Sequence, residues 1–443
     1  MTDSIDSSLP RRSFIKTVAV STATASMLPT ILKGYENGSI SKTINIGIVG
    51  IGGRGAGAVF DALRADSNVK LVAVAEAFRD RLDGGLANLI KKVNAENPEL
   101  SANIAVTEEN KFVGFDAYEK LLATDVDMVI LTTPPHFRPL HAEAAIKAGK
   151  HVFAEKPLAT DAVGLKKITK VIEEAKTKNL SFLVGFCWRF DSQVVATMNE
   201  VLNKDAIGKV LNVQASFNSG GVWHRGNDAK WTQMDYQMRN WYYFTWLSGD
   251  HIVEQCVHNM DKLNWLMGDK PPISVSCFGG RQARTDKKYG NIYDHFSATY
   301  EYPDHVFANI ECRHQRGTDR SVKDYIRGTK GFCDLMGGKI MGTTDWRYKA
   351  SKSGTKSKYV VEHEELFKGI RSGKVINNGI PSVISTGMAI MGRMSAYTGR
   401  KIYWDHKSLP SLMQSQLDLS PKEYKFGDIE MRPIAIPGIT KHV

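Results

Sequence analysis

Apolar runs and segments with helical spacing alternate along the first part of the chain. Short runs rich in Ile, Val and Ala predict strands at residues 43–49, 69–75 and 127–132. Helical segments follow the first and the third run, at residues 56–65 and 140–148. Because strands that alternate with helices form parallel sheets, this order predicts an α/β fold.

A different pattern marks the second part of the chain. Alternation or β-branched content predicts strands at residues 210–217, 273–279, 295–302 and 306–313. Between the first two strands, residues 250–267 carry apolar side chains at helical spacing: Val253, Cys256, Val257, Met260, Leu263 and Met267. We expect a helix with one buried stripe there.

Composition narrows the class of protein. The chain has 443 residues, of which 42% are hydrophobic and 24% charged, so it buries a sizeable core in two or three domains. The net charge of +11 comes from dispersed cations without a nucleic-acid-binding motif, and we expect no nucleic-acid partner. Five cysteines form no C-x-x-C pair, so no metal site is predicted, and one long-range disulfide stays open.

The N-terminus resembles a twin-arginine export signal. Arg11 and Arg12 precede a weakly apolar stretch at residues 17–28, in which residues 23–25 form a possible A-x-A cleavage site. We therefore assign residues 1–40 to a signal and linker, and expect the export machinery as a partner and a periplasmic or otherwise exported location. The alternative is an N-terminal arm with accidental twin arginines. No later apolar run approaches the length of a transmembrane helix, so none is expected in the mature protein.

A glycine-rich motif follows the first predicted strand. Gly50, Gly52 and Gly55 form G-x-G-x-x-G, in which the glycines allow a tight turn, close approach to a pyrophosphate and helix packing. Glu76 ends the second strand, where an acid binds the adenosine ribose hydroxyls and disfavours the 2′-phosphate of NADP. The motif predicts that residues 41–187 form a Rossmann domain that binds NAD.

Further motifs carry a resemblance to a known family. Thr133-Pro134-Pro135-His136, A-G-K-H-V at residues 148–152 and E-K-P at residues 155–157 follow the glycine motif in order. This combination resembles the family of glucose-fructose oxidoreductase, inositol dehydrogenase and MocA proteins. The resemblance implies a second α/β domain at residues 188–443, with a large, mostly antiparallel open sheet through which the chain forms a homo-oligomer.

The resemblance also assigns residues. It implies that Lys156 reaches the substrate oxygen, and that the cofactor contacts are Gly50, Gly52, Gly53, Arg54, Gly55, Glu76, Thr133, Pro134, His136, Glu155 and Lys156. Many relatives have a histidine where this chain has Arg138, so whether His136 or Arg138 faces the nicotinamide stays open.

A histidine and an acid lie one turn apart on the predicted helix at residues 250–267. Relatives carry Asp-x-x-x-His at this place, which implies that His258 is the acid/base and Glu254 its orienting carboxylate. Histidine titrates near neutral pH and can take a hydroxyl proton. The alternative is a histidine that only satisfies a structural hydrogen bond.

Aromatic residues crowd before this helix and suggest a sugar cleft, because a carbohydrate ring presents C–H groups to aromatic faces. The candidate substrate contacts are Trp223, Arg239, Trp241, Tyr242, Asp250, His258 and Tyr293. About half of the aromatic residues in this region are expected in the core instead.

Together these features predict an exported NAD-dependent oxidoreductase that acts on a secondary hydroxyl of a sugar, glycoside or polyol and retains its cofactor tightly. One alternative is a glycosidase that oxidises C3 transiently and eliminates the C1 substituent. The other is a non-catalytic sugar or nucleotide sensor on the same fold.

Overall fold

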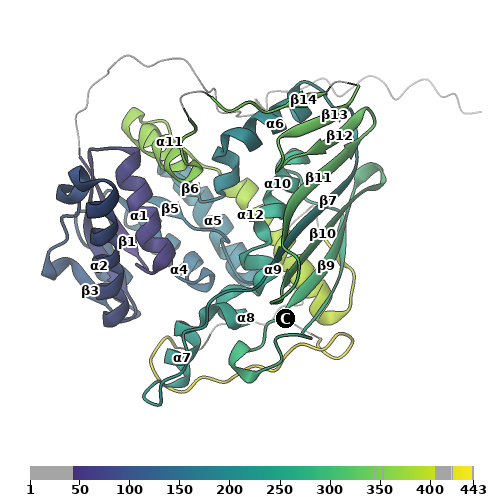
Figure 1. Ribbon diagram of the computed structural model, residues 1–443. Helices are drawn as coiled ribbons and strands as arrows, with labels where there is room; N and C mark the ends of the chain where they lie inside the picture. Colours follow the sequence, from purple (N-terminus) through teal and green to yellow (C-terminus); the bar gives the residue numbers. More distant parts are fainter. Residues whose placement is uncertain (1–42, 344, 352–353, 405–420, 422, 442–443) are drawn as a thin grey trace, which may run out of the picture. The chain divides into compact units, whose positions relative to one another are not determined.

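The computed structural model describes residues 43–343, 345–351, 354–404, 421 and 423–441, which carry two large sheets (Figure 1). The predicted export signal lies outside the described residues. Among the helices of the described part, none is long and apolar enough to cross a membrane.

The first sheet is parallel and has six strands in the order β3-β2-β1-β4-β5-β6. The strands are β1 (Ile44–Val49), β2 (Val69–Glu76), β3 (Lys111–Val113), β4 (Met128–Leu131), β5 (His151–Ala154) and β6 (Phe182–Val184). β1 and β4 are buried on both faces, which explains their continuous apolar runs. The strand order reverses between β1 and β4, where ligands bind in such sheets.

Helices cover both faces of the parallel sheet. One face packs against α1 (Gly53–Ala65), α2 (Arg79–Glu96) and α11 (Lys358–Ser372), which lies against α1. The other face packs against α3 (Ala117–Leu122), α4 (Arg138–Lys147) and α5 (Ala162–Thr177). α11 follows all but the last strand of the second sheet in sequence, so the chain returns to the dinucleotide-binding part.

The second sheet has nine strands in the order β14-β13-β12-β11-β7-β10-β9-β8-β15. The strands are β7 (Val210–Ser219), β8 (Ser274–Gly280), β9 (His295–Tyr302), β10 (Val306–His314), β11 (Ser321–Gly328), β12 (Gly331–Asp334), β13 (Lys339–Gly342), β14 (Trp346–Arg347) and β15 (Ile402–Tyr403). All neighbours are antiparallel except β7 and β10. The predicted α/β fold with a parallel sheet and a large, mostly antiparallel sheet is confirmed.

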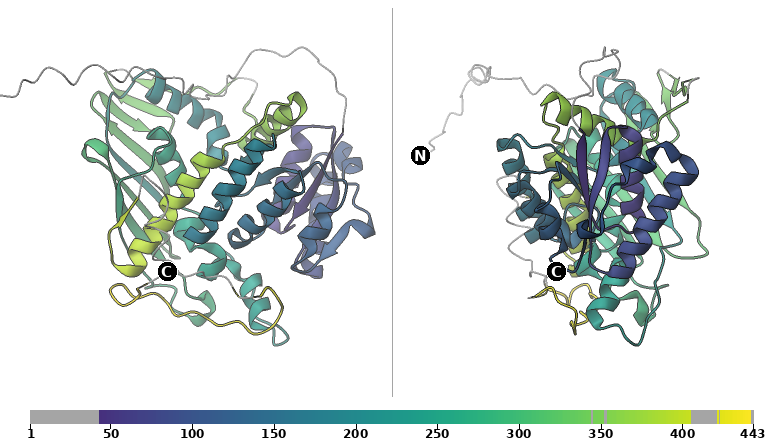
Figure 2. Two further views of the ribbon diagram at one scale, coloured as in Figure 1. Left: turned by 180° about the vertical axis from the view of Figure 1, so that it is seen from behind. Right: turned by 90° about the vertical axis from the view of Figure 1, so that its left-hand side faces the viewer.

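One face of the second sheet is covered by helices. α10 (Val257–Leu266) and α12 (Gly379–Thr398) pack on it, and α6 (Ser192–Asn203) lies on the same side (Figure 1). α12 also packs against α5, so that one apolar core continues from one sheet to the other (Figure 2). The short helices α7 (Gln233–Arg239), α8 (Thr245–Ser248) and α9 (His251–Glu254) precede α10.

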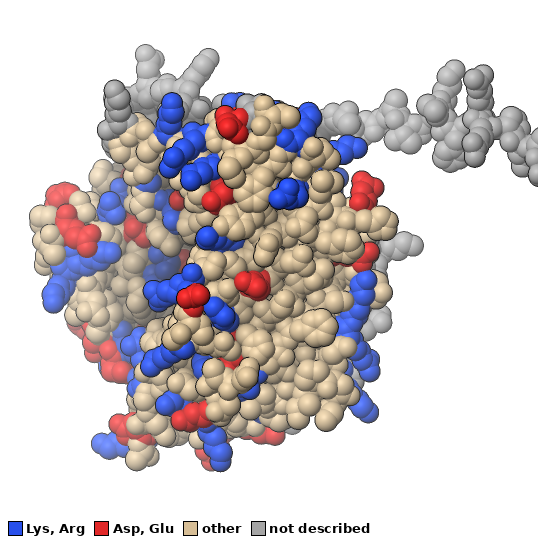
Figure 3. All heavy atoms as spheres, turned by 45° about the vertical axis from the view of Figure 1, so that its right-hand side comes forward, with Lys and Arg blue, Asp and Glu red and all other residues tan. Residues whose placement is uncertain are grey.

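The opposite face of this sheet carries no described helix (Figure 1). β10 alternates buried and exposed side chains, as a strand with one open face does. Exposed apolar residues of the sheet include Leu211, Phe278, Phe307, Val322, Met341 and Tyr403. Figure 3 looks toward this side of the molecule, where a broad area has few charged side chains.

The helix predicted at residues 250–267 is broken into α9 and α10. Asp250 has a φ of +73° and caps α9 by accepting a hydrogen bond from the backbone N–H of His251. After Glu254 the ladder is interrupted, and the N–H of His258 donates to the carbonyl of Gln255 at 3.3 Å. The break leaves the carbonyl oxygen of Glu254 outside the regular helical pattern.

Candidate active site

A groove runs along the carboxyl ends of β1, β2, β4 and β5. Its first pocket extends from Gly50 and Gly52 to Glu76, and its second surrounds Lys156. Thr132, Thr133 and Trp241 line both pockets, so the two are continuous. The groove lies at the reversal of strand order, which is where dinucleotides bind in this type of sheet.

The glycine loop has the shape that a dinucleotide needs. Gly50 has a φ of +93°, and a Cβ on Gly55 would lie 2.1 Å from the carbonyl oxygen of Gly50. A Cβ on Gly52, in contrast, would meet only Arg81 Nη2 at 3.7 Å, so the backbone there is open to a ligand. Gly53 begins α1, whose free N–H groups favour an anion. These residues fit NAD.

Glu76 lies where the ribose contact is expected. It lines the first pocket, and its Oε1 accepts a hydrogen bond from the N–H of Ala77 at 2.8 Å. Burial raises the pKa of Glu76 above its usual value. Arg81, which no sequence motif predicts as a contact, lines the same pocket and offers a positive charge beside the glycine loop.

The second pocket is a polar cavity of about 290 Å³. It brings together the three predicted catalytic residues, Lys156, Glu254 and His258. Its other polar lining residues are Arg54, Thr132, Thr133, Arg138, Glu155, Gln255 and Tyr359. Arg138, Gln255 and Tyr359 were not predicted as contacts, and Tyr359 comes from α11, which is remote in sequence.

Lys156 is held by Glu254 through two hydrogen bonds. Lys156 Nζ donates to the carboxylate Oε1 of Glu254 at 2.9 Å and to its backbone carbonyl at 2.5 Å. The second bond is possible because the break between α9 and α10 releases that carbonyl. The prediction that Glu254 orients His258 is therefore wrong for this structure, in which the carboxylate positions the lysine.

His258 is partly buried at the pocket, and its Nδ1 has no hydrogen-bond partner among the described residues. Burial, followed by the positive charges of Lys156 and Lys262, lowers the pKa of His258 well below its usual value. The imidazole is thus neutral at pH 7, and its unprotonated nitrogen can accept a hydrogen bond from a substrate hydroxyl.

Arg54 faces the second pocket and not the first. Its Nε donates to Glu155 Oε1 at 2.6 Å, and its Nη2 lies 3.6 Å from Glu362 Oε1. Glu362 is fully buried, and burial raises its pKa well above the usual value. Arg54 and Glu155, both predicted as cofactor contacts, form an ion pair beside Lys156. Glu362 of α11 is the second carboxylate next to Arg54.

The open choice between His136 and Arg138 has a clear structural answer. Arg138 is 2% exposed, lines the second pocket and donates to the carbonyls of Pro157 and Thr133 at 2.7 and 2.8 Å. His136 instead shares a 2.7 Å hydrogen bond with the hydroxyl of Tyr424. Of the two, Arg138 is the residue that faces the candidate active site, while Pro134 lines the first pocket.

Tyr424 belongs to a C-terminal strap, residues 423–441, that contacts both parts of the molecule. Phe426 packs on Phe78 and Phe115 with ring centroids 5.3 and 4.8 Å apart, and Tyr424 packs on Phe137 at 5.2 Å. These three phenylalanines line the first pocket. The strap therefore supports the wall of the cofactor groove.

The predicted substrate contacts divide into groups. Trp241 lines both pockets, and Trp223 lies next to it with ring centroids 6.0 Å apart. Arg239 lines the cofactor pocket and pairs with Asp80 through two hydrogen bonds of 2.8 Å. Tyr242 is 3% exposed and donates its hydroxyl to Gln255 at 3.1 Å, so it supports the pocket from behind.

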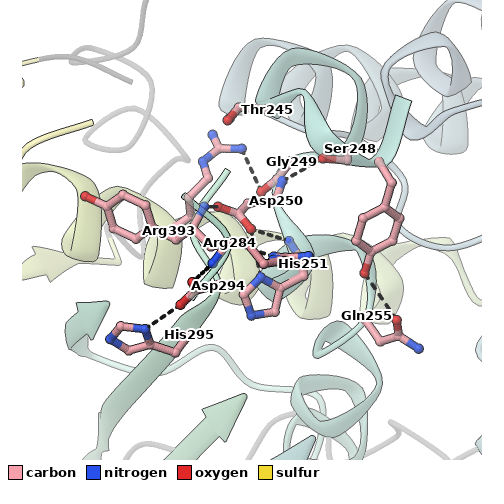
Figure 4. A network of polar contacts seen from close by, with 12 residues as sticks. Thr245, Ser248, Gly249, Asp250, His251, Gln255, Arg284, Asp294, His295 and Arg393 are labelled. Atoms are coloured by element: carbon pink, nitrogen blue, oxygen red, sulfur yellow. Dashed lines mark hydrogen bonds and ion pairs between the residues drawn. The ribbon is translucent and has the colours of Figure 1, made fainter. Parts of the chain in front are cut away.

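Asp250 and Tyr293 are not brought into the pocket. The fully buried carboxylate of Asp250 accepts hydrogen bonds from Tyr397 Oη, His251 Nδ1 and the N–H of Tyr293, and it lies in a polar network at the start of α9 (Figure 4). Tyr293 is 2% exposed and donates its hydroxyl to the carbonyl of Ala435. Their prediction as substrate contacts is corrected: both stabilise the second domain.

Comparison with known protein families matches both domains of this fold. The profile of the "Oxidoreductase family, NAD-binding Rossmann fold" matches residues 44–186, and that of the "GFO/IDH/MocA C-terminal domain" matches residues 195–333. A solved structure described as GenD2 from gentamicin A biosynthesis in complex with NAD has the same fold, with a TM-score of 0.62 at 17% identity, covering 84% of this chain and 99% of its own.

Curated relatives are similar in sequence. The chain is 27% identical over 295 residues to 2,7-anhydro-N-acetylneuraminate hydratase of Escherichia coli K12, covering 65% of this chain and 66% of the relative. It is 26% identical over 257 residues to inositol 2-dehydrogenase of Rhizobium meliloti, covering 58% and 64%. The chain thus spans somewhat less than two thirds of these relatives. With both halves matched, the chain belongs to the GFO/IDH/MocA oxidoreductase family.

Proposed function

We propose that the protein is an NAD-dependent oxidoreductase acting on a secondary hydroxyl of a sugar, glycoside or polyol. The observation that carries the proposal is the convergence of Lys156, Glu254 and His258 on one polar pocket, which continues into the glycine-loop groove. The inositol dehydrogenase among the relatives supports the substrate class.

The side chains have separate roles in this proposal. NAD, when bound, supplies the hydride acceptor. Lys156, fixed by Glu254 at 2.9 Å, donates a hydrogen bond to the reacting substrate oxygen and stabilises the negative charge that develops there. His258 is neutral at pH 7 and takes the hydroxyl proton. Arg138 braces the turn after Lys156 through the carbonyl of Pro157.

The lining of the pocket favours a polyhydroxylated substrate. Guanidinium, ammonium, carboxylate, amide and hydroxyl groups surround the cavity, and Trp241 supplies an aromatic face. Hydroxyl groups of a sugar satisfy such a set by donating and accepting, whereas an apolar substrate would leave buried polar groups without partners.

The experiment that tests the role of Lys156 compares Lys156→Met with the control Lys166→Met, which removes an exposed lysine from α5. Purified protein is incubated with NAD and a panel of methyl α- and β-glycosides and polyols, and products are weighed by mass spectrometry. We expect Lys156→Met to lose about 10²- to 10³-fold in kcat while NAD affinity changes little, because the lysine acts on the developing charge. Turnover of Lys156→Met at the rate of Lys166→Met would refute the role.

A second candidate is net cleavage or hydration of the substrate without net oxidation. The hydratase among the relatives favours it, because its name describes addition of water and not a dehydrogenase reaction. Released free sugar with NAD unconsumed would identify this outcome in the same assay. If His258→Ala has the same activity as the wild type in every assay, the protein is instead a non-catalytic sensor.

We also propose that the protein is exported through the twin-arginine route and retains its cofactor. The strap supports retention, since Tyr424 and Phe426 back the wall of the cofactor pocket. Nucleotide released by denaturing gel-filtered protein tests retention, and its absence would contradict it. Replacement of Arg11 and Arg12 by Lys should abolish export in cells, and unchanged export would contradict the proposal.

Finally, we propose a homo-oligomer formed through the open face of the second sheet. Exposed apolar patches of this kind mark interfaces, and Phe278 on β8 is 78% exposed. Light scattering should show a smaller species for Phe278→Glu than for the control Ile90→Glu, which alters an exposed residue of α2. Equal masses for both variants would argue against this interface.

A further inference from the structure

A separate cavity of about 150 Å³ lies at one end of the second sheet. β7 and β10 are the only parallel neighbours among the described strands of that sheet, so both end at the same edge. Gly220 and Gly221 follow β7, Arg316 follows β10, and Arg284 comes from the loop between β8 and β9. The cavity is therefore built by three connections that meet at this edge.

Arg284 is a buried cation with unused hydrogen-bond donors. It is 8% exposed, and its Nη2 donates to the carbonyl of Tyr293 at 2.7 Å. Its Nε and Nη1 are buried and have no hydrogen-bond partner, and no carboxylate of the described residues forms an ion pair with it. A buried cation with two unpaired N–H donors and no carboxylate beside it is costly, so this arrangement favours an anion in the cavity.

The loop that carries Arg284 is held in place. Asp294 Oδ2 accepts hydrogen bonds from the backbone N–H groups of Gln282, Ala283 and Arg284 at 2.9, 2.6 and 2.8 Å. Its Oδ1 is bonded to His295 Nδ1 (Figure 4). The carboxylate of Asp294 thus holds the loop through backbone N–H groups. It forms no ion pair with the guanidinium group of Arg284.

The rest of the lining suits a negatively charged group. Arg316 is exposed and forms no ion pair with a described residue, and the lining contains no carboxylate. A Cβ on Gly221 would lie 4.0 Å from Arg284 Nη1, so the glycine places no side chain between the guanidinium and the cavity. Tyr243 and Tyr289 flank Arg284, with ring centroids 5.7 and 6.0 Å from the guanidinium carbon.

We propose that this cavity binds the oxyanion group of a small ligand, a carboxylate, sulfate or phosphate. Arg284 is the buried anchor, because a guanidinium presents paired N–H donors to such a group. Arg316 adds a second charge at the edge of the cavity. Trp241 lines the candidate active site and Tyr243 lines this cavity, so the two sites lie on different parts of one short segment. The proposal does not depend on the oxidoreductase activity.

Isothermal titration calorimetry of the full chain tests the proposal, with inorganic sulfate, inorganic phosphate, galacturonate and neutral galactose as probes at constant ionic strength. We expect saturable binding of at least one oxyanion and an affinity at least tenfold lower in Arg284→Gln. Arg316→Gln should weaken binding less, and Arg320→Gln, in the same turn after β10, should not change it. Arg284→Lys provides a second test in which the buried charge is kept while the paired donors are lost, and it should also bind more weakly.

The outcomes are distinct. Tighter binding of galacturonate than of sulfate and phosphate would identify an acidic sugar as the ligand class, and the reverse would identify a free inorganic oxyanion. The absence of saturable oxyanion binding to the wild type, or unchanged affinity in both Arg284 variants, would overturn the proposal whatever the enzyme assays show.

Discussion

His363 makes the attachment of α11 to the parallel-sheet domain sensitive to acid. The ring is fully buried, lies 4.3 Å from the ring of Phe153 and 6.0 Å from that of Phe367, and neither nitrogen has a hydrogen-bond partner among the described residues. Burial, and then the charge of Arg54, lowers the pKa of His363 to about 3. We predict that His363→Leu removes part of the loss of stability that the wild type suffers in acid.

The sign and size follow from proton linkage. In the unfolded chain the histidine has its usual pKa near 6.5 and takes up a proton as the pH falls, while the folded chain keeps the ring neutral down to about pH 3. The stability that the neutral ring contributes is therefore complete above pH 6.5 and is lost progressively toward pH 3. Between pH 7 and pH 5 the loss amounts to about 2 kcal/mol for this one residue.

Equilibrium urea unfolding at pH 7 and at pH 5 measures the effect. At each pH, the free energy of unfolding of His363→Leu is subtracted from that of the wild type. The change in this difference between the two pH values isolates the titration of His363, because the packing cost of the substitution is common to both. We expect this difference to shift by about 2 kcal/mol in favour of the variant at pH 5. His305→Asn is the control, since His305 is exposed and its φ of +57° suits asparagine. A shift near zero would refute the buried neutral state of His363.

Three further outcomes are expected. Gly55→Ala should abolish NAD binding in a fluorescence titration, because its Cβ would lie 2.1 Å from a loop carbonyl oxygen; binding within threefold of wild type would contradict this packing. Arg239→Lys should weaken NAD binding about two- to fivefold by losing the paired bonds to Asp80, and unchanged affinity would exclude a role in the pocket. Tyr424→Phe should speed NAD release in stopped flow, because it removes the 2.7 Å hydrogen bond to His136. An unchanged release rate would show that this bond of the strap does not help to retain the cofactor.

The sequence predicted the parts of the site that depend on local pattern. The order of strand, glycine loop, helix and acid placed Gly50, Gly52 and Glu76 in the first pocket, since those positions follow from chain geometry over a few residues. The family motifs likewise brought Lys156, Glu254 and His258 to one cavity.

The remaining contacts depend on tertiary structure. Tyr359 and Glu362 reach the site from α11, about two hundred residues after Glu155 and Lys156, and no local pattern links them. The pairing of Glu254 with Lys156 depends on a helix break that the apolar periodicity concealed. Asp250 looked like a hydroxyl partner because it is polar and adjacent, but burial and four donors assign it to the core.

The return of α11 to α1 has a consequence for folding during synthesis. β6 ends at Val184, whereas α11 and the strand-like contact of Asn377 with Phe182 are made only about 190 residues later. At ribosomal rates this interval lasts roughly 10–40 s, during which the side of α1 that α11 later covers stays open. The dinucleotide-binding part therefore cannot finish folding ahead of the second domain, and a chaperone that shields this apolar surface on the ribosome would act in that window.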